Sequence, residues 1–495
     1  MATDRPLYAE VADPGSLARF GEEIEAANPS DWPGYPDRLR RARTATGARH
    51  AVTTGVATVG GEPCVLVGFE FAFLGGSMGA AEGARIVRAF SVAVAERLPM
   101  VCVSASGGSR MQEGTSALLQ MQAVAAAVAG ARRAGIPHIA VAGDPTTGGV
   151  WSSLIAAADL IISVPGARVS FSGSRTRPPG TDPGSPEYLA DRKWAHGFID
   201  VLSSGPGLRA EVAAAVRLLS PRSRGDVPHR APLPAWPAAG DPGDGDGDGD
   251  GDGDGDGDGD GDGDGVPDAD AWAHVGSARS LRRARADRWL AGYFGPTVEI
   301  RGDRCGGVDS GLRCGFGRHE GTTIAYVAQT GERITPAGCR TAARLLGLAA
   351  RLRLPVLTLI DTPGAAATPA DEAAGVGPAI AELFVAMASS PVPITSVIIG
   401  EGVSGGALAL ASPSDLWIAQ DGYLAVTAPE LASSILKLGV HDIPRVATWL
   451  RLTPAELMSR GIVRGIIRPP ASVAGQRRRS GGRPEVVQGG ADPAA

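Results

Sequence analysis

Short apolar runs bounded by glycine and proline recur along the chain and predict buried strands. They are residues 100–106, 138–143, 160–164, 356–361 and 395–400. Alanine- and leucine-rich stretches with arginine on one face lie between them, most clearly at 83–98 and 339–353, and these predict helices. Unbroken apolar strands that alternate with helices are typical of a mostly parallel, buried sheet. The pattern therefore predicts an α/β fold.

The same order of strands, helices and turns occurs twice. Landmark residues of the two copies are separated by a constant 256 positions: Pro99 and Pro355, Gly108 and Gly364, Pro137 and Pro393, Gly149 and Gly405, and Asp159 and Asp415. Loops of unrelated segments differ in length, so agreement at one spacing indicates an internal duplication.

A repeat of alternating glycine and aspartate separates the copies at residues 240–265. It has no apolar face and its carboxylates repel one another, which predicts a flexible linker. A calcium loop is the weaker alternative, because the repeat offers carboxylates without a framework to place them. The predicted division is a first domain at 1–235, a linker at 236–270, a second domain at 271–470 and a disordered tail at 471–495.

The net charge of −6 comes from this repeat, because the eleven aspartates from Asp244 to Asp264 leave the rest of the chain mildly basic. That charge suits an anionic small molecule, and it is too scattered to predict nucleic-acid binding. No apolar run is long enough to span a membrane, and no signal-peptide core is seen. Five cysteines without a C-x-x-C pair indicate reduced thiols. We therefore expect a cytoplasmic protein without a zinc site.

The candidate chemistry lies in two strand-to-helix turns of each copy. These turns are Ser106-Gly107-Gly108 and Thr147-Gly148-Gly149 in the first copy, and Thr362-Pro363-Gly364 and Ser404-Gly405-Gly406 in the second. Glycine lets a ligand approach backbone N–H groups, and the first amides of a helix have no partner within it. Two such turns that face one spot would form an oxyanion hole. The alternative is that these glycines serve only the tight packing of helix on strand.

Two other motifs overlap the second copy. Residues 402–406 spell G-x-S-x-G, a nucleophile elbow, and Asp415 or Asp421 and then His441 follow in hydrolase order. Residues 400–405 spell G-x-G-x-x-G, a weak dinucleotide signal. The first copy keeps the glycines but neither motif, which favours oxyanion holes.

No side chain in these turns is an evident base. None of the seven histidines lies in the four turns, and the histidines do not cluster as metal ligands would. No Walker A sequence is present. Amides that stabilise an anion without a protein base imply that a cofactor or substrate supplies the base.

Longer stretches resemble a known family. Residues 33–47 (PGYPDRLRRARTATG), 69–90, 103–114 (VSASGGSRMQEG) and 144–150 (DPTTGGV) resemble the β subunit of bacterial acetyl-CoA carboxylase carboxyltransferase. Residues 298–304 (VEIRGDR), 360–365 (IDTPGA), 399–410 and 426–437 resemble its α subunit. The resemblance covers roughly residues 15–205 and 275–470. It implies two ClpP/crotonase-like domains, one β-type and one α-type, fused in one chain.

The resemblance also implies a mechanism. Carboxybiotin, carried on a biotin carboxyl carrier protein and made by biotin carboxylase, releases CO2 in the site. Biotin then takes a proton from acetyl-CoA, and the resulting enolate attacks CO2 to give malonyl-CoA. By position, Gly148 and Gly149 with Gly107 and Gly108 would hold the acyl-CoA oxygen. Gly405 and Gly406 with Gly364 would hold the biotin oxygen, in a homodimer or larger assembly whose halves meet across chains.

The chain departs from the family pattern at three places. The zinc ribbon with which the β subunit normally starts is not found before Cys64, so no zinc is expected. Residues 366–375 (AATPADEAAG) and 169–178 (VSFSGSRTRP) replace the usual runs, and we expect both to line the substrate channel and to affect acyl-CoA choice. Two alternatives follow. One is a biotin-dependent decarboxylase of the same fold, and the other is a catalytically degenerate subunit that organises a carboxylase complex.

Overall fold

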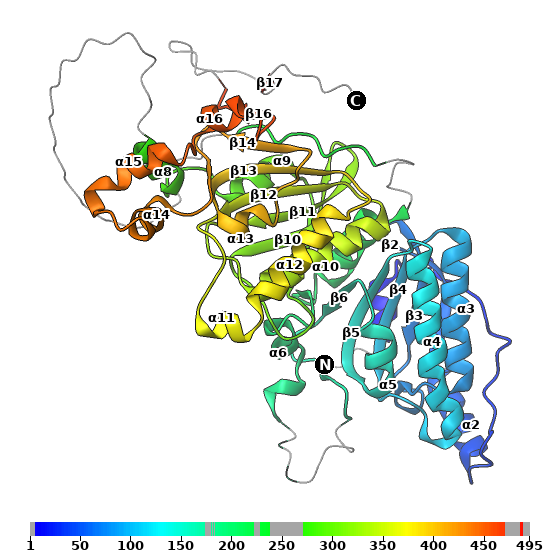
Figure 1. The fold of residues 1–495 in the computed structure, drawn as a ribbon. Coiled ribbons are helices and arrows are strands. Elements are labelled where there is room, and N and C mark those ends of the chain that lie inside the picture. Colours follow the sequence, from blue (N-terminus) through cyan, green and yellow to red (C-terminus); the bar gives the residue numbers. More distant parts are fainter. Residues whose placement is uncertain are drawn as a thin grey trace, which may run out of the picture.

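The protein folds into two α/β halves, each built on its own sheet (Figure 1). The structure, a computed structural model, describes residues 5–173, 180, 182, 184–221, 228–237, 271–470 and 486–488. The predicted linker from residue 238 onward, and the predicted tail apart from 486–488, lie outside the described residues. Within the described ranges, no helix has the length and apolar character needed to cross a lipid bilayer.

The first sheet has a parallel centre and an antiparallel edge. Its parallel strands, in spatial order, are β3 (Glu62–Phe69), β4 (Met100–Ser106), β5 (His138–Thr147), β6 (Leu160–Ser163) and β8 (Val201–Leu202). The remaining strands are β1 (Ala18–Arg19) and β2 (Val52–Val59) at the antiparallel edge, and β7 (Val169–Ser170) beside the end of β5. The helices are α1 (Leu7–Val11), α2 (Tyr35–Thr46), α3 (Ala80–Glu96), α4 (Thr115–Arg133), α5 (Gly148–Val150) with its π-helical continuation (Trp151–Ile155), α6 (Ala190–Ala195) and α7 (Leu208–Leu219).

The second sheet repeats this plan. Its parallel strands are β11 (Thr322–Gln329), β12 (Val356–Thr362), β13 (Ile394–Val403), β14 (Leu416–Ala419) and β16 (Gly465–Ile467). The remaining strands are β9 (Thr297–Ile300), β10 (Leu312–His319), β15 (Tyr423–Ala425) and β17 (Val486–Gln488). The helices are α8 (Ala271–Arg279), α9 (Ala286–Tyr293), α10 (Pro336–Leu352), α11 (Pro369–Ala373), α12 (Val376–Ala388), α13 (Ser404–Leu408), α14 (Pro429–Ile435), α15 (Ile443–Trp449) and α16 (Pro454–Ser459).

Helices cover both faces of the first sheet, because successive side chains of a strand point to opposite sides. Met100 and Cys102 pack in one apolar cluster with α3 and α4. Val101 and Val103 pack in another with α1 and α7. The cluster that contains Val101 and Val103 continues into β9, β10 and α10 of the second half. One apolar core therefore joins the two halves.

The predicted internal duplication is confirmed by the geometry. Helices α3 and α10 both contain 17 residues and begin 256 positions apart. Met100 of β4 lies opposite His138 of β5, and Val356 of β12 lies opposite Ile394 of β13, at the same offset. The two halves therefore share strand register as well as element order.

Residues 228–237 pack on the second half, although the sequence pattern assigns the chain up to residue 235 to the first domain. Trp236 packs edge-to-face on Trp289 of α9, with ring centroids 5.8 Å apart. The Ala231 carbonyl accepts a hydrogen bond from Thr395 of β13 (3.1 Å). Proline-rich sequence gives no periodic signal, and these contacts exist only in the folded protein.

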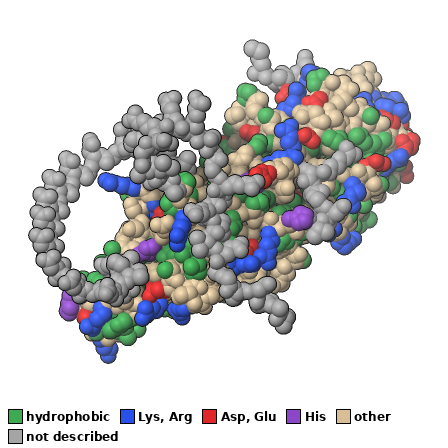
Figure 2. Space-filling model, turned by 90° about the horizontal axis from the view of Figure 1, so that it is seen from above, with side chains coloured by type: hydrophobic (Ala, Val, Ile, Leu, Met, Phe, Trp, Pro, Cys, Tyr) green, Lys and Arg blue, Asp and Glu red, His purple; other side chains and the backbone are tan. Residues whose placement is uncertain are grey.

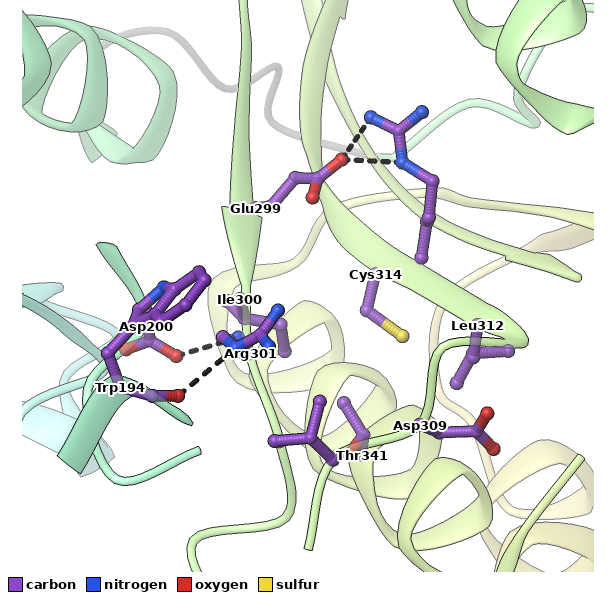
Figure 3. Close-up of a pocket in the computed structure, with 12 residues that line it drawn as sticks. Trp194, Asp200, Glu299, Ile300, Arg301, Asp309, Leu312, Cys314 and Thr341 are labelled. Atoms are coloured by element: carbon purple, nitrogen blue, oxygen red, sulfur yellow. Dashed lines mark hydrogen bonds and ion pairs between the residues drawn. The ribbon is translucent and has the colours of Figure 1, made fainter. Parts of the chain in front are cut away.

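Charged groups line the seam between the halves (Figure 3). Buried Asp200 of the first half accepts the Arg301 N–H and a guanidinium N–H of Arg344, both at 3.0 Å, and pairs with Arg304. Burial would raise the pKa of Asp200, but the neighbouring arginines hold it below its ordinary value. The Arg301 guanidinium lies 4.1 Å over the Trp194 ring, beside a cavity of about 140 Å³. These contacts fix how the halves sit on each other.

On the visible part of the face in Figure 2, charged side chains of both signs are mixed with apolar ones. On the face shown in Figure 2, outside the grey residues, arginine and lysine alternate with aspartate, glutamate and apolar groups. That face presents no continuous basic tract of the kind that nucleic-acid-binding proteins use.

The first residue of β5 makes the stability of the fold depend on pH. His138 is buried, its ring packs edge-to-face on Phe90, and burial lowers its pKa to about 4. An unfolded histidine binds its proton near pH 6.5, so between these values the unfolded chain holds more protons and stability falls as pH falls. We expect the wild type to lose about 3 kcal/mol more stability than His138→Leu between pH 7.5 and 4. Urea unfolding at both pH values measures this difference.

The matched control is His441→Leu, because the His441 side chain is 86% exposed. This variant should keep the pH dependence of the wild type. If His138→Leu loses stability toward low pH as steeply as the wild type does, His138 does not carry the effect.

Candidate active site

Two turns of the first half meet at the carboxyl ends of β4 and β5. The chain leaves β4 through Gly107 and Gly108, and it leaves β5 through Gly148. The φ angles of Gly108 and Gly148 are +103° and +62°, in the region that favours glycine. A Cβ atom on Gly108 would lie 3.2 Å from the Gly148 Cα and 3.5 Å from the Gly149 nitrogen. The two turns are therefore in direct contact.

Buried hydroxyl groups hold these turns together. Ser106 Oγ donates a hydrogen bond to the Gly76 carbonyl (2.6 Å) and accepts the Gly108 N–H (3.1 Å). Thr147 Oγ1 donates to the Ser106 carbonyl (3.2 Å). Because these side chains are shielded from water, they keep the backbone of the two turns in one arrangement.

The second half builds the same pair of turns. The Gly364 φ angle is +120°, and its N–H donates to Thr362 Oγ1 (3.1 Å). A Cβ atom on Gly406 would lie 2.6 Å from the Ala365 nitrogen, so α13 packs directly on the turn after β12. A Cβ atom on Gly405 would meet nothing within 4 Å. Gly405 therefore borders open space, which a ligand could enter.

The seven predicted glycines differ in whether their amides are free to bind a ligand. Four N–H groups already donate within the protein: Gly107 to the Gly75 carbonyl, Gly108 to Ser106 Oγ, Gly148 to the Phe171 carbonyl and Gly364 to Thr362 Oγ1. Among the described residues, the N–H groups of Gly149, Gly405 and Gly406 have no acceptor. These three amides are the unpaired ones, and Gly149 and Gly406 are buried. The other four glycines shape the turns.

An ionic cluster that the sequence analysis missed anchors the first turn. Arg110 follows this turn, is 1% exposed, and donates to Glu82 (2.7 Å) and Glu113 (3.2 Å). The Tyr35 hydroxyl donates to the same Glu113 oxygen (2.5 Å), and burial raises the pKa of Tyr35. The sequence signal that could have revealed this cluster is an arginine and a glutamate three residues apart, just after the glycines. The three partners lie on separate elements, and only the fold brings them together.

A second ionic cluster anchors the turn after β12. Asp361 is fully buried and pairs with Arg283 (2.5 Å) and Arg285 (3.1 Å), which lie between α8 and α9. Asp361 also accepts the Glu401 N–H (3.1 Å), so it links the ends of β12 and β13. Sequence reasoning missed this cluster, because no local pattern connects residues so far apart along the chain.

A cavity of about 720 Å³ opens onto the first pair of turns. Its lining residues all belong to the first half: Arg38, Phe71, Leu74, Gly75, Ser77, Gly107, Ser109, Met111, Gln112, Pro145, Thr147, Arg168 and Gly173. None of these described residues is a histidine, cysteine, aspartate or glutamate. Helices α5 and α13 lie well apart in Figure 1. The two pairs of turns therefore do not share this cavity within one chain.

The hydrolase interpretation is not supported by the geometry. Ser404 does sit in a strained turn, with a φ angle of +59°. Asp415, however, is buried and accepts hydrogen bonds from Thr395 and Trp417, and the exposed His441 pairs with Asp442, its neighbour along the chain. Within the described part of the chain, no histidine bonds to Ser404. A nucleophile without a base is not activated.

The dinucleotide interpretation finds no support among the described residues, and the calcium-loop alternative at residues 240–265 lies outside them. Gly400 and Gly402 lie inside β13 rather than in a loop, and the following helix, α13, has five residues. A phosphate-binding turn needs its glycines between strand and helix. In the described ranges, no three His, Cys, Asp or Glu side chains group as metal ligands would.

Two family models match the chain, one in each half. A carboxyl transferase domain matches residues 16–176, and an acetyl-CoA carboxylase carboxyltransferase-like model matches residues 266–482. The β/α subunits of acetyl-CoA carboxylase carboxyltransferase from Salinispora tropica are 36% identical over 487 residues, with 94% of this chain and 82% of that protein covered. The corresponding protein of Parafrankia sp. is 38% identical and covers 95% of this chain and 78% of its own length. The chain belongs to the acetyl-CoA carboxylase carboxyltransferase family.

The names of other proteins similar to this carboxyltransferase are not restricted to acetyl-CoA. A probable biotin-dependent acyl-CoA carboxylase beta3 subunit of Mycobacterium bovis is 32% identical, with 94% of this chain and 89% of that protein covered. A solved transcarboxylase 12S hexamer with hydrolysed methylmalonyl-CoA bound is 19% identical, with a TM-score of 0.72 over 93% of this chain and 86% of that one. The likeness confirms the predicted crotonase-like carboxyltransferase fold for both halves.

The two segments that depart from the carboxyltransferase pattern differ in whether their described residues line the first cavity. Gly173, from residues 169–178, lines the cavity of the first half, and Phe171 is 71% exposed close by. Residues 174–178 lie outside the described residues. Residues 366–375 contain the short helix α11 (Pro369–Ala373), capped by Thr368 and Asp371. The described part of the first segment therefore reaches the candidate site.

Proposed function

We propose that the chain transfers a carboxyl group from carboxybiotin, held on a carrier protein, to acetyl-CoA and so forms malonyl-CoA. The observation that carries this proposal is the repeated pair of turns with unpaired amides. Gly149 supplies such an amide in the first half, and Gly405 and Gly406 supply two in the second. A reaction with two carbonyl oxygens that gain negative charge needs two such sites.

The first pair of turns is proposed to hold the thioester oxygen of the acyl-CoA. The Gly149 N–H points from the start of α5, where the helix dipole adds positive potential. The cavity beside it has the volume range of small-molecule sites, and Phe71 and Met111 give it apolar walls. An amide that binds the oxygen more strongly as it becomes an enolate lowers the barrier by about 3 kcal/mol.

The second pair of turns is proposed to hold the ureido oxygen of biotin. Open space beside Gly405 admits a ligand, and the unpaired Gly405 and Gly406 amides fit a carbonyl-type acceptor. When bound, carboxybiotin would supply the CO2 and, once that is released, the base that accepts the substrate proton. The protein's part is to bind, orient and stabilise charge, which fits a first cavity without a histidine, cysteine, aspartate or glutamate among its described lining residues.

The proposed assembly is a homodimer or larger, with biotin carboxylase and a biotin carboxyl carrier protein as partners. In one chain the two pairs of turns do not share the first cavity, so a complete site needs halves from different chains. Large apolar side chains stay exposed on α4 and α14, where a second copy would cover them: Leu118, Leu119, Leu431 and Ile435. The acetyl group is favoured because the Salinispora tropica and Parafrankia relatives, which span both halves, carry acetyl-CoA carboxylase names.

The decisive experiment is the reverse reaction. Purified protein, malonyl-CoA and biocytin should release acetyl-CoA, followed with a coupled assay, without any partner protein. A faster reaction with methylmalonyl-CoA would move the proposal to propionyl-CoA as substrate. No turnover with either substrate, in protein that is folded and oligomeric, would favour the degenerate organising subunit instead.

A further inference from the structure

One side chain connects the two turns of the second half. Gln329 is the last residue of β11 and is fully buried. Its Oε1 accepts the Asp361 N–H (3.2 Å), and its Nε2 donates to the Gly406 carbonyl (3.0 Å). The orientation of the amide is fixed, because one partner can only donate and the other can only accept.

Each of these partners belongs to a different turn. Asp361 directly precedes Thr362-Pro363-Gly364 at the end of β12, and Gly406 lies in the first turn of α13. The carboxamide therefore sets the spacing between the two turns from a third strand. The Gly405 and Gly406 amides move with α13, so this spacing decides where they point.

The first half uses no such side chain. In the first sheet, Val67 of β3 lies opposite Cys102 of β4. The corresponding pair in the second sheet is Val327 of β11 and Thr358 of β12, because the duplication relates β3 to β11 and β4 to β12. Two residues after these valines, Phe69 is therefore the counterpart of Gln329. The Phe69 side chain packs in the apolar cluster under α3. There, Thr147 and Ser106 connect the turns directly. A carboxamide buried where its counterpart is apolar is costly unless both its groups are used, as they are here.

We infer that Gln329 is a positioning residue for the biotin side of the reaction. This inference rests on the proposed function. Without the carboxamide, the Gly406 carbonyl and Asp361 N–H lose their buried partners, and α13 is free to shift against the turn after β12. A shift of a fraction of an ångström misaligns the Gly405 and Gly406 amides. The acyl-CoA side keeps its geometry, because its turns have separate hydrogen bonds.

The test compares Gln329→Met, which has nearly the same shape and no hydrogen bonds, with Gln329→Glu. In the malonyl-CoA and biocytin assay, we expect Gln329→Met to lower kcat/KM for biocytin by about 10- to 100-fold, with KM for malonyl-CoA changed less than about twofold. Gln329→Glu should approach the wild type at low pH, where its protonated carboxyl can donate to Gly406. Its activity relative to the wild type should fall as pH rises, because the ionised carboxylate repels that carbonyl.

The matched control is Tyr326→Phe on the same strand. Tyr326 is also buried, and its hydroxyl donates to Glu299 rather than to either turn (3.2 Å). The Tyr326→Phe variant should leave kcat/KM for biocytin within about twofold of the wild type. An equal loss in Tyr326→Phe, unchanged kinetics in Gln329→Met, or a parallel loss for malonyl-CoA would each overturn the inference.

A readout independent of activity separates this inference from the proposed function. Hydrogen–deuterium exchange in Gln329→Met should accelerate for peptides that cover α13 and stay unchanged for those that cover α5. If the wild type shows no turnover, the proposed function fails. Unchanged exchange at α13 would show in any case that Gln329 does not hold the two turns.

Discussion

Gly405→Asp should abolish carboxyl transfer and leave the fold intact. A Cβ atom at this position meets nothing within 4 Å, and its φ angle is not among the positive ones, so an aspartate fits without strain. Its carboxylate would occupy the space beside the unpaired amides and repel the oxygen that they are proposed to bind. Loss of one oxyanion donor costs about 100- to 1000-fold in rate, and an added negative charge should cost at least as much. Malonyl-CoA and biocytin turnover measures the loss, and thermal unfolding reports on the fold.

The neighbouring glycines provide matched controls. Gly405→Ala adds a methyl group in open space and should unfold at the wild-type temperature. Gly406→Ala would place a Cβ atom 2.6 Å from the Ala365 nitrogen and should lower the melting temperature, because backbone cannot move aside. A Gly405→Asp protein with at least a tenth of wild-type turnover would contradict a role for this amide.

Mixing two inactive variants should restore activity if the sites form between chains. Gly148→Asp would disable the first half, since a side chain there approaches the Gly108 Cα to 3.2 Å and lies next to the Gly149 amide. Gly405→Asp would disable the second half. In a mixed dimer, one site combines both intact halves. Random pairing makes about half of the dimers mixed, so about a quarter of wild-type activity should return.

The mixture is prepared by coexpression with two different affinity tags, and sequential purification isolates the mixed dimers. These should show about half of the wild-type turnover per dimer. Self-mixed samples of each variant, treated in the same way, are the baseline. If the purified mixed dimers stay at that baseline, each chain builds its site alone, and pairing across chains is wrong.

The sequence by itself determined the duplicated α/β plan and the four glycine turns. Both are local signals. An apolar run bounded by glycine or proline makes a strand wherever it occurs, and Gly108 and Gly364 are needed because their backbones adopt positive φ angles. The landmarks of the two copies are separated by a constant 256 positions because the loops between them have the same lengths in both copies. The family could be inferred from the same short motifs, whose order along the chain is specific.

Only the tertiary structure decided which amides remain available. Whether the Gly148 N–H is free depends on the Phe171 carbonyl, and that contact arises when β7 pairs with the end of β5. The clusters around Arg110 and Asp361, and the bridge through Gln329, join residues far apart in the chain. Their partners are chosen by packing and burial, because a buried charge or amide must find a partner in space. A sequence pattern records which residues can make such contacts, and the fold alone determines which of them do.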